Sequence, residues 1–349
     1  MSEPFSYGGQ AVIEGVMMRG RRAMAVAVRH PSGMVVLHDE PVAAHDGGHG
    51  WGRWASRPLL RGIVHLYDTL LLGMRALAFS ATVAAEAEAA AGGGQPRIST
   101  GHADSAIATT PAPADEEREM HISTGHADSA IATAAGGDNE RSATWGMGIA
   151  LGAALLIAVG VFFVGPLLLV RLVEELVPID GWSVLLEGAI RLGLFFGYLW
   201  GIGRFPDVQR VFAYHGAEHK AINAFEAGVP LDAAHVARFG VLHPRCGTSF
   251  LLYVALISVA VFALAGHPPL PLRLATRVVL VPVIAALAYE LIRFAGRHRQ
   301  YPLVQALLAP GLALQTLTTR QPDESQIEVA ICALRRALEL DASRDQERD

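Results

Sequence analysis

Four apolar stretches dominate the pattern of hydrophobic and polar positions along this chain of 349 residues. They cover residues 145–170, 183–203, 248–266 and 274–295. About 20 apolar residues are enough for a helix to cross the hydrocarbon core of a bilayer. Two of the stretches contain no charged residue, and in the other two the charges lie toward the ends, where long side chains reach the head groups. The pattern predicts a predominantly α membrane protein with about four transmembrane helices.

Residues 58–90 predict a further, amphipathic helix. Its polar side chains recur at spacings of four, three and seven residues, so they form one narrow stripe on an otherwise apolar cylinder: Arg61, His65, Asp68 and Arg75. Such a helix lies flat in the membrane interface, or it packs in the bundle with its stripe toward a polar cavity. The interfacial position is the favoured interpretation. In the other one, His65 and Asp68 line a functional site.

Residues 1–57 predict a small β-rich unit. Two β-prone runs, 23–29 and 34–38, flank Pro31-Ser32-Gly33, which is typical of a hairpin turn. The preceding segment, GGQAVIEGVMMRG at 8–20, has an apolar centre between glycines that permit close backbone approach. This pattern favours a strand with glycine-rich flanks, and taken alone it indicates no function.

The segment 91–143, between the amphipathic helix and the first span, predicts a disordered linker. It consists mainly of Ala, Gly, Pro, Ser, Thr and acidic residues, which leave little to bury. Its sequence ISTGHADSAIAT at 98–109 is repeated letter for letter at 122–133. His102 and His126 belong to this duplication and are not expected to bind a ligand.

The rest of the chain divides into three parts. Residues 144–300 form the predicted membrane domain, which includes a long loop at 204–248. Residues 301–340 predict C-terminal helices, interrupted at Pro310-Gly311, and 341–349 form a charged tail.

Composition agrees with a membrane protein, and charge indicates its orientation. The chain is 52% hydrophobic and 17% charged, with a mean hydropathy of +0.33, whereas soluble domains carry about 25% charged residues. Basic residues gather before the first span, in the loop 204–248 and after the last span, while Glu174 and Glu175 make the connection after the first span acidic. By the positive-inside rule both termini and the loop are cytoplasmic. The net charge of −5 offers no case for nucleic acid.

The most informative motif is H-x-x-E-H, formed by His215, Glu218 and His219. On a helix, side chains four residues apart lie on one face about 6 Å apart, so both imidazoles can bind one metal ion. A carboxylate beside the second histidine can act as general base toward a water molecule, as in the inverzincins. The motif predicts a divalent metal, for which zinc is best suited, and the alternative is a histidine-rich helix end near lipid head groups.

Further ligands are expected from the segment HPRC at 243–246. His243 and Cys246 have a spacing at which a loop can present both side chains to one ion. If four side chains bind, the site is closed, tetrahedral and structural, and if three bind, one position stays open for water. Glu226 shares the helix face of the histidines but lies about 10 Å farther along the axis. The sequence leaves the choice between three and four ligands open.

Four side chains near the motif are candidates for supporting roles. Asn223 lies one helical turn beyond His219 and is suited to hold a ligand in place. Tyr214 can offer a hydroxyl to a bound oxyanion, and Arg245 or Lys220 can stabilise developing negative charge.

Three segments together resemble the YqhQ-like bacterial membrane proteins. They are GGQAVIEGVMMRG at 8–20, YHGAEHKAINAFEAG at 214–228 with HPRCGTSF at 243–250, and LTTRQPDESQIEVAICAL at 317–334. The resemblance covers nearly the whole chain apart from 91–143, which has the character of an insertion. It implies a multi-pass protein of the bacterial inner (plasma) membrane. Members are often labelled metal-dependent enzymes, a label that rests on the same histidines, so the resemblance supplies no substrate.

Two classes of function follow from these residues. The first and slightly favoured one is a zinc-dependent hydrolase that uses Glu218 as base and acts on a membrane protein, a peptide or a lipid-linked molecule at the cytoplasmic side of the bilayer. The second is a non-enzymatic membrane scaffold or assembly factor with a structural metal site. A small transporter is a third alternative, which the lack of paired charges deep in the predicted spans disfavours. Glu187 and Arg191, four residues apart, can simply pair with each other near one interface.

Overall fold

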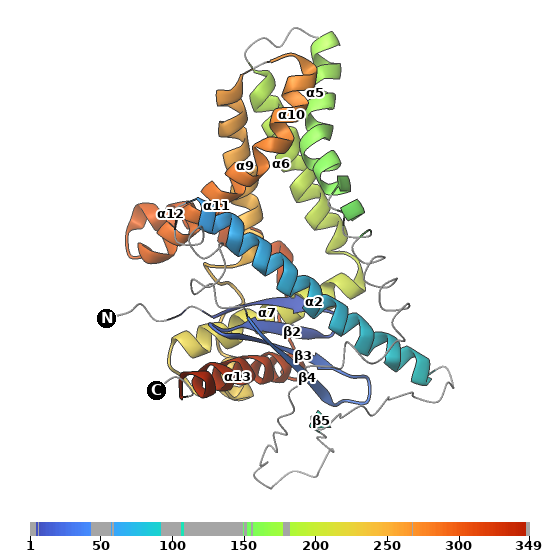
Figure 1. Ribbon diagram of the computed structural model, residues 1–349, viewed down its shortest axis with the longest axis vertical. Coiled ribbons are helices and arrows are strands. Elements are labelled where there is room, and N and C mark those ends of the chain that lie inside the picture. The colour runs from blue at the N-terminus through green and yellow to red at the C-terminus, as the bar shows by residue number, and fades with distance from the viewer. Residues whose placement is uncertain are drawn as a thin grey trace.

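The computed structural model describes residues 5, 7–42, 57, 59–91, 106–107, 149, 152–154, 156–176, 182–266 and 268–346. One antiparallel sheet has the strand order β1 (Gly8–Val12), β2 (Gly15–Arg19), β3 (Ala23–Arg29), β4 (Val35–Pro41) and β5 (Ala106–Ile107). The rest of the described chain is mainly helical (Figure 1). The helices are α2 (Leu60–Ala91), α5 (Gly165–Leu176) with the π-helical turn η1 (Gly160–Val164) before it, α6 (Ser183–Ile202), α7 (Pro206–Glu226), α8 (Ala233–Val236), α9 (Gly247–Ala265), α10 (Leu270–Val279), α11 (Val281–Arg297), α12 (Pro302–Thr318) and α13 (Glu324–Gln346).

Strands β1 to β4 are joined by short turns. The predicted strand at 23–29 is confirmed, and so is the turn after it, where Gly33 has a φ of 89° that favours glycine. The glycine-rich segment at 8–20 forms two paired strands, where the sequence favoured one. The turn between them places Glu14 at a φ of 55°, which is uncommon for a residue with a side chain.

The sheet is buried on both faces. On one face the side chains of β2 and β3 pack against α7 and α13, through Val16, Met18, Ala25 and Ala27. On the other face they pack against α2, through Met17, Met24, Val26 and Val28. Successive residues of a strand point to opposite faces, so a nearly continuous apolar run supplies both cores. The predicted N-terminal β-rich unit therefore shares its core with α2, α7 and the C-terminal helix.

The polar stripe of α2 contacts protein groups. Arg61 Nε donates to Glu290 of α11 at 2.6 Å, and the ring of His65 stacks on Tyr289 at 5.4 Å between centroids. Asp68 lies 3.9 Å from Arg19 and Arg75 lies 3.0 Å from Glu40, measured between charged atoms. The opposite face exposes large apolar side chains, among them Leu66, Tyr67 and Leu70. The helix is amphipathic as predicted, but its stripe is turned inward because ion-pair partners lie there.

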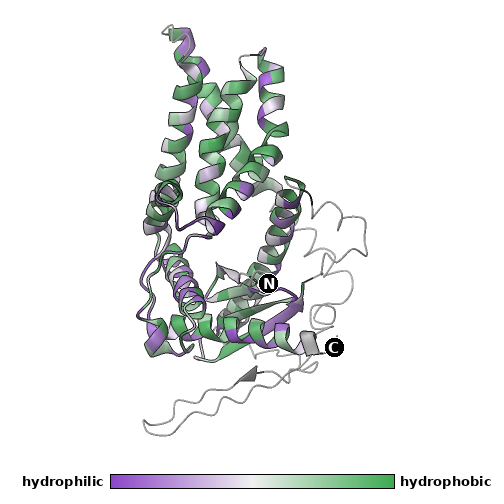
Figure 2. Ribbon diagram, turned by 90° about the vertical axis from the view of Figure 1, so that its left-hand side faces the viewer, coloured by the Kyte–Doolittle hydropathy of each residue, from purple (hydrophilic) through white to green (hydrophobic). Residues whose placement is uncertain are grey.

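Within the described residues, four helices are long and apolar enough to cross a membrane. They are Leu60–Ala85, Gly152–Leu176, Ser183–Ile202 and Gly247–Ala265, and the bent pair of α10 and α11 makes up to five. The last four of these correspond to the four predicted spans, and the first lies within the predicted amphipathic helix. Apolar residues predominate along the bundle of α5, α6, α9 and α10. In the helices and strands of the sheet domain, apolar and polar residues alternate (Figure 2).

Several predicted boundaries are corrected. The acidic connection after the first span is partly helical, since Glu174 and Glu175 belong to α5. Helix α12 continues through Pro310, although proline removes one helical hydrogen bond. Hydroxyl groups of α9 contact α12 near this proline, because Ser249 donates to the carbonyl of Gly311 and Tyr253 to that of Leu307. The predicted charged tail from residue 341 is helical as far as Gln346.

The predicted disordered linker at 91–143 lies almost entirely outside the described residues, and so do both copies of its repeat. Strand β5 is the described part of the first copy, and it pairs with Val35 and Val36 at the edge of the sheet. The first residues of the predicted span at 145–170 and the end of the tail also lie outside the described part of the chain.

A cluster of buried charges joins three of the apolar helices. Glu187 of α6 accepts hydrogen bonds from Arg191 at 2.7 Å, from Arg273 at 3.3 Å and from Arg277 at 2.7 Å. The guanidinium groups of Arg191 and Arg277 also lie over the ring of Phe262 in α9. The sequence predicted only a pair of Glu187 with Arg191 near the interface. The apolar helices therefore carry more paired charges than the sequence indicated, because Arg273 and Arg277 reach Glu187 from another helix.

Candidate metal site

Helix α7 positions the two histidines of the motif. It begins at Pro206, which is suited to the first turn of a helix, and ends before Gly228, whose φ of 68° favours glycine. Its buried face packs on the sheet and on α13. His215 and His219 lie one turn apart, with their ring centroids separated by 4.4 Å. The spacing of four residues therefore brings the imidazoles together, as the sequence predicts.

Both imidazole rings are fixed by backbone carbonyl groups. His215 Nδ1 lies 2.8 Å from the carbonyl oxygen of Thr318, and His219 Nδ1 lies 2.6 Å from that of Val241. Since a carbonyl can only accept, each Nδ1 is the donor, and in a neutral ring each Nε2 then carries a free lone pair. Metal-binding histidines in proteins commonly have this arrangement.

Cys246 supplies a third ligand atom from another element. It precedes the first turn of α9, and its sulfur accepts from the backbone N–H of Thr248. Its Sγ lies 3.1 Å from His215 Nε2. The ligand atoms of His215, His219 and Cys246 all lie within 4.8 Å of one another. These three side chains are the donors that zinc prefers.

Buried atoms at the site are left without hydrogen bonds in the described part of the chain. They are His219 Nε2, His243 Nε2 and Glu218 Oε2. Such atoms cost free energy when they are buried without a partner. Burial also lowers the pKa of His219, which keeps its ring neutral. A neutral, immobilised imidazole with a free Nε2 fits a metal ligand, so the residues present pass this test for a divalent ion.

Glu218 is buried near the candidate ligands His215 and His219. It is only 5% exposed, and burial raises the pKa of its carboxyl above the usual value, while His215, His243 and the backbone N–H of Gly9 act in the opposite direction. Strand β1 crosses directly over this carboxylate. A Cβ atom on Gly9 would lie 3.0 Å from Glu218 Cδ and 2.4 Å from the carbonyl oxygen of Met17. The close approach explains the glycine that the sequence left without a role.

His243 lies next to the group of three but outside it. Its ring centroid is 5.7 Å from that of His219, and its Nε2 lies 3.7 Å from a carboxylate oxygen of Glu226. Its backbone is held from α12, where Gln315 accepts from its N–H at 2.9 Å and donates to its carbonyl at 2.8 Å. The arrangement thus favours three ligands over the four that the sequence also allowed.

Two of the proposed supporting residues, Tyr214 and Lys220, have different roles from those expected. Tyr214 points away into the core, and its hydroxyl donates to Glu14 at 3.3 Å. Burial raises the pKa of Tyr214 well above its usual value. Lys220 donates to the carbonyls of Ala237 and Phe239 at 2.8 and 2.6 Å. Neither side chain is therefore available to a bound oxyanion.

Asn223 and Arg245 hold the connection between α7 and α9, which carries Val241 and Cys246. Asn223 Nδ2 donates to the carbonyls of Gly240 and Leu242, on either side of the Val241 carbonyl that fixes His219. Asn223 therefore holds the backbone on both sides of the carbonyl that contacts His219, which agrees with the indirect role expected for it. Arg245 forms an ion pair with Glu226, the carboxylate that the sequence placed too far from the histidines to bind the same ion.

The sequence missed the contribution of the end of α12 and the residues directly after it. Thr318 fixes His215 through its carbonyl, and Arg320 donates its N–H to the carbonyl of Phe212 in α7. A Cβ atom on Gly216 would lie 2.1 Å from the carbonyl oxygen of Arg320. Glycine in the middle of the motif costs about 1 kcal/mol of helix propensity, and this backbone contact is the reason for it. Backbone carbonyls leave no signal in a sequence, so this support could not be predicted.

His65 and Asp68 do not belong to the site. His65 stacks on Tyr289 and Asp68 lies near Arg19, so both side chains are on the face of α2 that meets α11 and the sheet. The site is instead made by α7, the start of α9 and the end of α12.

The chain was compared with known families, proteins and solved structures. A family described as "Protein of unknown function (DUF1385)" matches residues 57–340. The "Uncharacterized protein YqhQ" of Bacillus subtilis (strain 168) is 29% identical over 347 residues, which cover 98% of this chain and 95% of that protein. No solved structure matches the chain. Since the match covers most of the chain and agrees with the resemblance of its motifs, the chain belongs to the DUF1385 family.

Proposed function

We propose that this protein is a zinc-dependent hydrolase in which His215, His219 and Cys246 hold the metal. The observation that carries the proposal is the pair of Nδ1–carbonyl hydrogen bonds, which leave two Nε2 lone pairs beside one cysteine sulfur. Three protein ligands leave one coordination position of zinc open, as in catalytic sites. A zinc ion bound there would supply Lewis acidity toward the oxygen of a carbonyl or phosphoryl group.

Glu218 is proposed as the general base. Its Oε2 atom has no hydrogen-bond partner in the described part of the chain, and burial raises the pKa of the carboxyl, which makes the carboxylate a better proton acceptor. It would take a proton from the attacking water and pass it to the leaving group. Gly9 and its strand hold the carboxylate in place and cover it from that side. The substrate class suggested by apolar helices next to the site is a membrane protein, a peptide or a lipid-linked molecule.

A second function, a membrane scaffold with a structural metal, is favoured by burial of the site. His219 is 1% and Cys246 is 6% exposed, and the ligands join α7 to α9 and, through Thr318, to α12. A metal there would fasten the domain around the sheet to the apolar helices. Glu218→Gln distinguishes the two functions, because only the hydrolase needs a base at this position.

The protein purified from cells is expected to contain about one equivalent of zinc or a similar divalent ion. His215→Ala combined with His219→Ala removes two of three ligands, and Cys246→Ser removes the thiolate, so both variants are expected to lose the metal. His235→Ala and Cys332→Ser change the same residue types away from the site and are expected to keep it. Elemental analysis of the purified variants measures the ratio. Full metal content in the double histidine variant would exclude this site.

The proposed location is the bacterial inner membrane, with both termini and the site on the cytoplasmic side. Three single cysteines, at Thr109, Ala234 and Trp182, test it in a Cys332→Ala background that keeps the buried Cys246. An impermeant maleimide added to intact cells is expected to label only Trp182→Cys, which lies between α5 and α6. Thr109→Cys and Ala234→Cys are expected to react only after the cells are opened. The reverse pattern would show that the orientation derived from the basic residues is wrong.

A further inference from the structure

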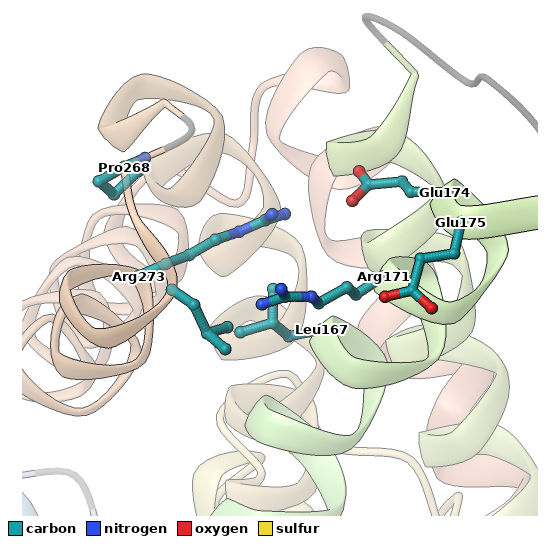
Figure 3. A pocket seen from close by; sticks show the side chains of 7 residues that line it. Leu167, Arg171, Glu174, Glu175, Pro268 and Arg273 are labelled. Carbon is teal, nitrogen blue, oxygen red and sulfur yellow. The ribbon is translucent and has the colours of Figure 1, made fainter.

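A pocket lined by two arginines and two glutamates lies at the end of the bundle far from the sheet. It has a volume of about 330 Å³ and lies between α5 and α10, lined by Leu167, Arg171, Glu174, Glu175, Pro268, Leu270 and Arg273. Figure 3 shows the side chains of Arg171 and Arg273 pointing into the same space from opposite sides. Pockets for small molecules start at about this volume.

The cluster of Glu187 with three arginines adjoins this pocket. Arg273 belongs to both, and its Nη2 shares one carboxylate oxygen of Glu187 with Nη2 of Arg277. Arg277 is fully buried, and its Nε and Nη1 atoms have no hydrogen-bond partner among the described residues, nor does Nε of Arg273. One carboxylate thus faces three guanidinium groups, so the cluster holds two uncompensated positive charges. Buried charges that lack a counter-ion are costly, and an anion next to Arg273 would remove part of that cost.

The total charge around the pocket fits one negative group. Arg171 adds a positive charge, and Glu174 and Glu175 add two negative ones at the lining. The pocket lining and the cluster together contain four arginines and three glutamates, which leaves a net charge of +1. They are Arg171, Arg191, Arg273 and Arg277 with Glu174, Glu175 and Glu187. A phosphodiester carries one negative charge at neutral pH. The planar guanidinium group matches phosphate oxygens in geometry as well as in charge.

The surroundings of the pocket are apolar. Leu168 and Leu172 on α5 are 50% and 56% exposed, and Leu272 on α10 is 55% exposed. Arg171 and Arg273 lie close to the ends of helices that are long and apolar enough to cross a membrane, which is the depth of the phosphate groups in a bilayer. A ligand bound here would have its charged group in the pocket and apolar chains against exposed leucines.

We propose that this pocket binds the phosphate of a membrane phospholipid through Arg171 and Arg273, with Arg277 supplying the uncompensated charge behind them. The ligand class is set by two features together, the excess positive charge and the exposed leucines around it. A soluble phosphate would use the first feature alone. The site lies in the apolar helices and shares no residue with the metal site, so it does not depend on the proposed hydrolase activity.

The test uses the full-length protein in detergent and native mass spectrometry. Phosphatidylglycerol is the probe, and diacylglycerol with the same acyl chains but no phosphate is the matched control. Wild-type protein is expected to retain the phospholipid, and Arg171→Gln together with Arg273→Gln to reduce its affinity about tenfold or more, since both contacts involve charged groups. Arg171→Gln alone changes an exposed side chain and will fold, so a smaller loss in that variant keeps the test valid if the double variant is unstable. Arg204→Gln, just beyond the opposite end of α6, is expected to bind as wild type does.

Two results would overturn the proposal. Equal binding of diacylglycerol, or unchanged phospholipid binding in both pocket variants, would show that the arginines do not recognise phosphate. Glycerol phosphate and inorganic phosphate form the soluble arm of the test. Displacement of the phospholipid by either compound at equal concentration would assign the pocket to a soluble anion.

Discussion

Glu218→Gln is expected to abolish the function of the protein in cells while its metal content and folding stay unchanged. Glutamine has nearly the same shape and still accepts a hydrogen bond, but it cannot take a proton from water. General base catalysis contributes about 10²–10⁴ in rate, so the variant should fail to complement a deletion strain. Glu218 is not among the three side chains whose ligand atoms converge, so elemental analysis should find the same metal in the variant as in wild type.

Glu328→Gln is the matched control for this substitution. Glu328 lies on α13, is 48% exposed and pairs with Arg29, so the same chemical change there removes a carboxylate without touching the site. We expect this variant to complement nearly as wild type does. A Glu218→Gln protein that is metal-loaded and fully functional would favour the scaffold, since loss of a supporting contact weakens metal affinity by only about 10–100-fold.

The local parts of the site could be predicted because they follow helical spacing. His215 and His219 share a face of α7 for the same reason that any two residues four apart do. Cys246 could be recognised because a cysteine thiolate is a common zinc ligand. The support for these ligands could not be predicted. It comes from the carbonyls of Thr318 and Val241, and every residue has a carbonyl. The position of Gly9 over Glu218 depends on how β1 packs against α7, which is a contact between segments far apart in the chain.

The same limit applies to the fold. The apolar stretches predicted the long apolar helices because length and hydropathy are local properties. The stripe on α2 was recognised, but its direction depends on Glu290 and Tyr289, which lie on another helix. Likewise, the sequence alone indicates that Arg273 and Arg277 are charges near the end of an apolar stretch, and only the fold brings α10 to Glu187 of α6. The sequence paired Glu187 only with Arg191.

The role of Glu187 leads to the second large effect, because Glu187→Gln is expected to destabilise the bundle strongly. The carboxylate is 1% exposed and is the acceptor shared by Arg191, Arg273 and Arg277. Removing one partner from a buried ion pair costs about 3–5 kcal/mol, because the remaining charge stays buried. Here the uncompensated charge of the cluster would rise from two to three.

The same change in an exposed ion pair provides the comparison. Glu328 is 48% exposed and lies 3.1 Å from Arg29, so Glu328→Gln is expected to cost about 1 kcal/mol or less. The temperature at which half of the detergent-solubilised protein aggregates measures both variants. We expect Glu187→Gln to aggregate at a clearly lower temperature than Glu328→Gln. Equal temperatures would mean that the three arginines do not depend on Glu187, and the electrostatic account of how α6 is held to α10 would then be wrong.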